Sequence, residues 1–160
     1  MEQFQLLRQK SIKKIKVADH MLTMSYSLVK DPKILLSVIN NVYDAYDHAI
    51  TALLEYERLF KRVQAFKDNT DSKINLFIKI SDKLKIDKEH IKIIRELDEI
   101  KKAHKKSPVE FSRKGKFVIC SDSYEMKTLE IKHLKNYINK AKIFIEQIHK
   151  LTDRDDGIFR

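Results

Sequence analysis

An apolar residue recurs every three or four positions from residue 32 to residue 66, without a break. This seam contains Leu35, Val38, Val42, Ala45, Ala49, Leu53, Tyr56, Phe60 and Val63. The spacing is that of one helix face, and it predicts a helix of roughly 50 Å at about 1.5 Å per residue. Small residues at Ala45, Ala49 and Ala52 allow another helix to approach this rod closely.

The rest of the chain also favours helices. It has 160 residues with only two glycines and two prolines, and sheet proteins use those residues in their many turns. We therefore expect an all-α antiparallel bundle of about five helices, with a small β-hairpin before the last helix. Residues 1–151 would form one domain, and residues 152–160 a flexible tail.

Local signals place the expected elements along the chain. Asp31 and Pro32 mark the start of the helix over residues 32–66, after a first helix over residues 5–30. A shorter helix over 74–84 follows, and Asp87 can cap a fourth helix over 88–105. Residues 109–120 contain Gly115 between two short apolar runs, which is typical of a hairpin. A cap pattern at 122–125 predicts a last helix from about residue 122 to residue 151.

The helix over residues 32–66 carries a second apolar stripe. Its members are Ile39, Tyr43, Tyr46, Ile50 and Leu54. Two stripes indicate contacts on two sides, so the second stripe could face the last helix or another subunit. A simple bundle need not bury both stripes, and this predicts a homodimer through this helix.

The chain is strongly basic, with 33 Lys and Arg against 23 Asp and Glu, a formal net charge of +10. Such an excess attracts polyanions. Its densest segment comprises Lys101, Lys102, Lys105, Lys106, Arg113, Lys114 and Lys116. Phosphate backbones reward this arrangement, so these residues are the predicted nucleic-acid-binding site. The alternative is a solvated turn, in which Phe111 and Phe117 anchor the hairpin to the core rather than stack on bases.

The sequence offers little for a metal, a cofactor or a membrane. It has no P-loop, dinucleotide-binding fingerprint, G-x-S-x-G or H-E-x-x-H motif. Asp44 and His48 are helical neighbours, but their Asp-x-x-x-His spacing differs from the Glu-x-x-His motifs of di-iron bundles. We expect no metal and no cofactor. The lone Cys120 suits a reducing cytosol, and no apolar stretch is long enough to span a bilayer, so we expect a cytoplasmic protein.

Two segments carry a family resemblance. The run at residues 43–57, Tyr-Asp-Ala-Tyr-Asp-His-Ala-Ile-Thr-Ala-Leu-Leu-Glu-Tyr-Glu, resembles the core helix of the HEPN superfamily. The stretch from Glu99 to His104, before a loop and a closing helix, falls where that family places its R-x-x-x-x-H motif. The resemblance implies a small helical bundle, often dimeric, that cleaves RNA, binds it or partners a nucleotidyltransferase. His104 corresponds to the motif histidine, whereas Glu99 stands in the arginine position.

Three functional hypotheses follow from these features. The first is a non-catalytic HEPN-like module that binds RNA or a ribonucleoprotein surface through the basic segment. The second is a metal-independent endoribonuclease that uses His104, with Arg95 or Lys102 in the arginine role. The third is an interaction subunit, such as a nucleotidyltransferase partner, whose interface is the second stripe of the helix over residues 32–66. We expect the first, because the motif lacks its arginine.

Overall fold

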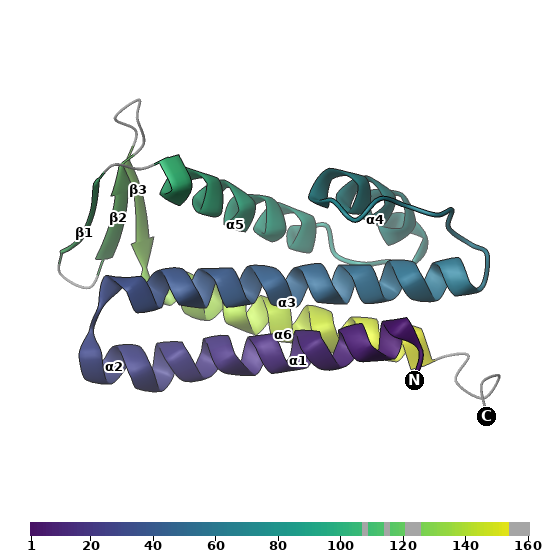
Figure 1. Cartoon of the computed structure of the whole chain (residues 1–160), viewed down its shortest axis with the longest axis horizontal. Helices are drawn as coiled ribbons and strands as arrows, with labels where there is room; N and C mark the ends of the chain where they lie inside the picture. Colours follow the sequence, from purple (N-terminus) through teal and green to yellow (C-terminus); the bar gives the residue numbers. More distant parts are fainter. Residues whose placement is uncertain (107–108, 114–115, 121–125, 154–160) are drawn as a thin grey trace.

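The computed structural model describes residues 1–106, 109–113, 116–120 and 126–153, and the side chains of residues 1–105 and 129–153. The chain begins with one helical rod, as predicted (Figure 1). It is α-helical in α1 (Gln3–His20) and α2 (Tyr26–Val29), which are joined by a π-helical turn, η1 (Met21–Ser25). The rod ends at Lys30, where the backbone turns into the left-handed region at φ 56°.

Helix α3 (Pro32–Leu59) is the centre of the molecule, and its start follows the sequence prediction. The Asp31 carboxylate accepts a hydrogen bond from the Lys33 amide at 3.0 Å, and Pro32 occupies the first helical position. Helices α1, α4, α5 and α6 all pack against α3. Both apolar stripes of α3 are therefore buried.

The C-terminal end of α3 differs from the prediction, because the helix stops at Leu59 rather than near Phe66. Lys61 adopts a left-handed backbone conformation at φ 58°, and the Arg62 amide donates back to the Glu57 carbonyl oxygen at 2.9 Å. This pattern closes the last turn and satisfies a helix-end carbonyl group that would otherwise lack a partner. The apolar spacing beyond residue 59 therefore does not continue the helix.

Two shorter helices follow on the other side of α3. Helix α4 (Thr70–Lys83) starts at Asn69, whose side chain accepts a hydrogen bond from the Ser72 amide at 2.9 Å. Helix α5 (Glu89–Lys106) starts after Asp87, whose carboxylate accepts from the Glu89 amide at 2.9 Å. The cap predicted at Asp87 is confirmed.

A small antiparallel sheet follows α5. The predicted hairpin is present as β1 (Val109–Arg113) and β2 (Lys116–Cys120), but β2 also pairs with a third strand, β3 (Met126–Glu130). The helix predicted over these residues is therefore wrong. Leu129 is buried at 5% exposure, so strand pairing together with core packing decides this segment.

The last helix, α6 (Ile131–Asp153), begins later and ends later than predicted. The cap pattern at 122–125 lies outside the described residues, as do residues 154–160 of the expected tail. Thr152, assigned to that tail, is completely buried. Arg8 of α1 donates to the Thr152 hydroxyl at 2.9 Å and to the Asp153 carboxylate at 2.7 Å, which fixes the end of α6 against α1.

The long helices form a layer of rods in which α1 runs antiparallel to both α3 and α6 (Figure 1). The ion pairs Lys14–Asp44 and Lys142–Asp19 join α1 to α3 and α1 to α6. The predicted all-α bundle is confirmed. Within the described part of the chain, no helix is long and apolar enough to cross a membrane.

The second stripe of α3 is buried inside a single chain. Tyr43, Tyr46, Ile50 and Leu54 are at most 7% exposed. The Tyr46 ring packs on Phe144 of α6, with 5.1 Å between ring centroids. Of the two alternatives, the stripe faces the last helix. The prediction of a dimer or partner interface through this stripe is wrong, because its side chains are already covered.

Candidate nucleic-acid interface

Helix α5 is amphipathic, and this presents its lysines to solvent. Its inner side buries Ile93, Ile94, Leu97 and Ile100, each at most 5% exposed. The remaining positions of the helix are mostly charged. The predicted basic residues at its C-terminal end therefore stand on a helix that the core holds in place.

The three lysines near the end of α5 have different surroundings. The Lys101 ammonium lies over the Tyr43 ring of α3, 4.0 Å from its centroid. Lys102 pairs with Asp98 one turn earlier at 2.8 Å, and this hydrogen bond raises the pKa of Lys102. Lys105 is exposed, and no carboxylate among the described residues pairs with it. Of these three lysines, Lys102 and Lys105 are exposed, and of those two Lys105 is the one without a described ion pair.

The sheet brings the second half of the basic segment to the same end of the molecule. Strand β2 packs against α5, and Figure 1 shows the C-terminal end of α5 directed toward the sheet. The strand register places Arg113 opposite Lys116, and Lys116 opposite Glu130 on β3. An acidic residue therefore borders the basic pair. The side chains of Lys106, Arg113 and Lys116, and the whole of Lys114, lie outside the described residues.

The same register separates the two phenylalanines of the hairpin. Phe117 is paired with Ser112 and Leu129, whereas Phe111 is paired with Val118. Paired positions share a face, and successive positions along a strand alternate between faces. The two phenylalanines therefore occupy positions on opposite faces of the sheet. The buried Leu129 is on the face to which position 117 belongs.

The residues predicted for catalysis are not brought together. Arg95 and His104 are nine positions apart on α5, so they are separated by about 13 Å along the axis and by about half a turn around it. Arg95 is exposed and His104 is half-buried. Within one chain, this geometry does not support the two side chains acting on one phosphodiester bond.

The neighbours Asp44 and His48 and the adjacent Glu89 and His90 include residues with structural contacts. His90 is buried at 4% exposure, and its Nδ1 lies 3.0 Å from the Tyr46 hydroxyl. Burial lowers the pKa of His90 and raises that of Tyr46. Asp44 pairs with Lys14 at 3.6 Å rather than with His48. Among the described residues, no three His, Cys, Asp or Glu side chains are grouped so as to hold a metal ion.

A buried lysine of α4 that pairs with two carboxylates was not predicted from the sequence. Lys73 is 5% exposed, and its ammonium pairs with Asp47 at 2.8 Å and with Asp68 at 3.0 Å. Burial lowers the pKa of Lys73, but the two carboxylates outweigh burial and the net shift is upward. No sequence pattern predicts these ion pairs, because Asp47, Asp68 and Lys73 lie in three separate segments of the chain.

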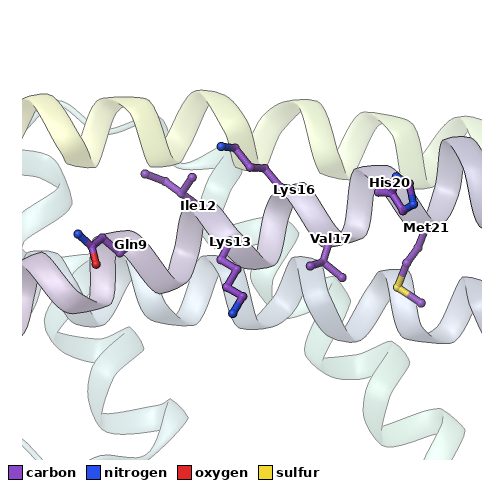
Figure 2. A pocket seen from close by; sticks show the side chains of 7 residues that line it. All are labelled: Gln9, Ile12, Lys13, Lys16, Val17, His20 and Met21. Atoms are coloured by element: carbon purple, nitrogen blue, oxygen red, sulfur yellow. The ribbon is translucent and has the colours of Figure 1, made fainter.

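A groove on the outer face of α1 was also missed (Figure 2). It has a volume of about 500 Å³, and α1 and the first residue of η1 supply its lining. The buried residues of the first rod include Ile15, Ala18 and Leu22, and the apolar Val17 of the groove, 38% exposed, lies off that stripe. An apolar residue off the stripe was the available sequence signal.

Comparisons with known proteins give no relative for this chain. No protein-family model matches the sequence. No curated protein and no solved structure matches it either.

Proposed function

We propose that this chain is a non-catalytic, HEPN-like helical module that binds RNA or a ribonucleoprotein surface. The observation that carries the proposal is that the C-terminal end of α5 and the sheet lie at the same end of the molecule, with β2 packed against α5 (Figure 1). Lys102 and Lys105 are exposed there, and Arg113 and Lys116 are paired on the adjacent strands. A cluster of cations from two elements can contact successive phosphates of one backbone.

The separation of Arg95 and His104 favours binding over cleavage. An RNA-cleaving site needs its cation and its general base near the same phosphate. Here the two residues point to different sides of α5, and Glu99 occupies the motif position of the arginine. Phosphate contacts need no such alignment, since they depend mainly on charge.

Binding to fluorescein-labelled single-stranded RNA, measured by anisotropy at several salt concentrations, tests this proposal. The logarithm of affinity should fall with the logarithm of salt concentration, by about 0.7 per phosphate contact. The double variant Lys102→Glu/Lys105→Glu should bind about tenfold more weakly, and equally so for all RNA sequences.

The matched control is Lys88→Glu/Lys92→Glu, with Lys88 just before α5 and Lys92 near its N-terminal end. Each pair combines one ion-paired lysine, Lys102 with Asp98 or Lys88 with Asp82, and one exposed lysine that no described carboxylate contacts. The control should keep nearly full affinity. Equal losses in the two variants would show a diffuse charge effect and would contradict a site at the α5 end.

The same samples test the enzyme alternative. Electrophoresis of the RNA after incubation should show intact strands, with or without His104→Ala. If the chain cleaves RNA and His104→Ala abolishes the cleavage, the binding-module proposal is wrong and the ribonuclease hypothesis replaces it.

A further inference from the structure

The outer face of α1 is not covered by any other element of the described chain. Figure 2 shows α6 along one side of α1 and α3 along the other, with Lys16 on the α6 side and Lys13 on the α3 side. Between these side chains lies the groove of about 500 Å³. Its floor is apolar, because Ile12 and Met21 are half-buried and also pack against the core, and Val17 lies between them.

The spacing of the lining residues indicates the shape of the occupant. Gln9, Ile12, Lys13, Lys16, Val17 and His20 follow one another at alternating steps of three and one. Groups of four side chains with this spacing form the holes into which a second helix inserts its side chains. The groove therefore matches a helix that lies along α1.

The charges on this face indicate the composition of that helix. Lys13 and Lys16 are exposed, and no carboxylate of the described residues pairs with either. The neighbouring acids are already engaged, since Asp19 bonds to Lys142 at 2.7 Å and Asp44 to Lys14 at 3.6 Å. A partner with Glu or Asp beside its apolar positions would supply the missing counter-charges.

We propose that the α1 groove binds an acidic amphipathic helix of a partner protein. A second copy of this chain fits less well, because it would bring the same lysines against each other. A membrane surface also fits less well. The apolar floor is recessed between lysine side chains. Single side chains of a partner helix can reach this floor more easily than a flat lipid surface can.

Apolar exposure continues along the same rod beyond the groove. Met24 is 53% exposed and Leu28 is 81% exposed. The rod therefore offers contacts over about three heptads, enough for a stable helix–helix interface. This proposal does not depend on RNA binding, because the α1 groove and the α5 end use different residues.

A designed peptide provides the probe. It contains about three heptads, with leucine at the two core positions and glutamate at the flanking positions. A second peptide replaces each glutamate with lysine. Fluorescence anisotropy of the labelled peptides with the full chain should show saturable binding of the acidic peptide and none of the basic peptide.

Charge reversal in the protein sharpens the test. Lys13→Glu/Lys16→Glu should weaken binding of the acidic peptide by about tenfold or more and should create binding of the basic peptide. Lys79→Glu/Lys83→Glu on α4 makes the same charge change elsewhere and should leave binding unchanged. Lys102→Glu/Lys105→Glu should also leave it unchanged, which separates this proposal from RNA binding. Circular dichroism of each variant verifies that it is folded.

Four outcomes would overturn the proposal. The first is no binding of the acidic peptide, and the second is equal binding of both peptides. The third is an affinity for the acidic peptide that does not change when Lys13 and Lys16 are replaced by glutamate. The fourth is tight binding to vesicles of anionic lipid that the acidic peptide fails to displace, which would assign the face to a membrane. NMR shifts of the bound protein should be largest over residues 9–24.

Discussion

Three lysines at helix ends occupy a backbone conformation that favours glycine. Lys30, Lys61 and Lys85 have φ values of 56°, 58° and 56°. They follow α2, α3 and α4, where the chain must leave the helix. The chain has only two glycines, Gly115 and Gly157, so none is available at positions 30, 61 and 85. Each lysine therefore bears the steric cost of the left-handed region.

Replacing these lysines with glycine should stabilise the fold. The left-handed conformation destabilises the folded state by about 1–2 kcal/mol for an L-residue. Glycine avoids this steric cost but loses more conformational entropy on folding, which costs about 0.5–1 kcal/mol. The net gain in the free energy of unfolding is therefore about 0.5–1 kcal/mol per site. All three lysines are exposed, and no described carboxylate pairs with them. The substitution thus removes no ion pair of the described structure.

The triple variant Lys30→Gly/Lys61→Gly/Lys85→Gly should gain about 1.5–3 kcal/mol, because the sites are far apart in the fold. For a chain of this size that raises Tm by about 3–12 °C. Thermal and urea unfolding followed by far-UV circular dichroism measures the change. Lys79→Gly, at an exposed position inside α4, is the control and should cost about 0.5–1 kcal/mol. A triple variant no more stable than the parent would refute the reasoning.

Further predictions concern the core, a buried histidine and the contact between the ends of α1 and α6. Leu53→Ala should lower the free energy of unfolding in urea by about 2–5 kcal/mol, since Leu53 is completely buried; a loss below about 1 kcal/mol would contradict the packing. Burial lowers the pKa of His90 below its ordinary 6.5. The free energy of unfolding should therefore be unaffected by this histidine above about pH 6.5 and should decrease as the pH falls below about 6.5, where the unfolded chain binds more protons than the folded chain. His90→Gln should flatten this part of the profile, and an unchanged slope would contradict it. Arg8→Met should cost about 1–2 kcal/mol, which is less than most of the range of about 1.5–3 kcal/mol for charged hydrogen bonds, because Asp153 is 38% exposed; hydrogen exchange should quicken at residues 148–153, and unchanged exchange would argue against the contact.

Local sequence patterns predict only part of the candidate interface. The basic segment was visible in the sequence as a run of lysines and arginines. The structure adds that Lys101 stacks on Tyr43 and that Lys102 pairs with Asp98. It also adds an acidic neighbour, Glu130, beside Lys116 in the strand register. The Lys101–Tyr43 contact joins segments far apart in the chain, and the Glu130 neighbour depends on a strand that local spacing does not reveal. Only the Lys102–Asp98 pair, four positions apart on one helix, is local.

The sequence by itself determined the elements whose signals are local. The seam of α3, the cap at Asp31 and the cap at Asp87 each depend on residues within a few positions of one another. Helix periodicity and capping act over one or two turns, so they can be recognised without knowing what packs against the helix.

The tertiary structure alone decided which surfaces are covered. The second stripe of α3 resembled an interface, yet Tyr46 lies against Phe144 and His90 within the chain. The segment 126–130 was predicted to be helix, yet it pairs with β2 as a strand. The outer face of α1 stays open because α3 and α6 occupy its other sides (Figure 2). Burial depends on long-range neighbours, and the same apolar spacing can serve a core or an interface.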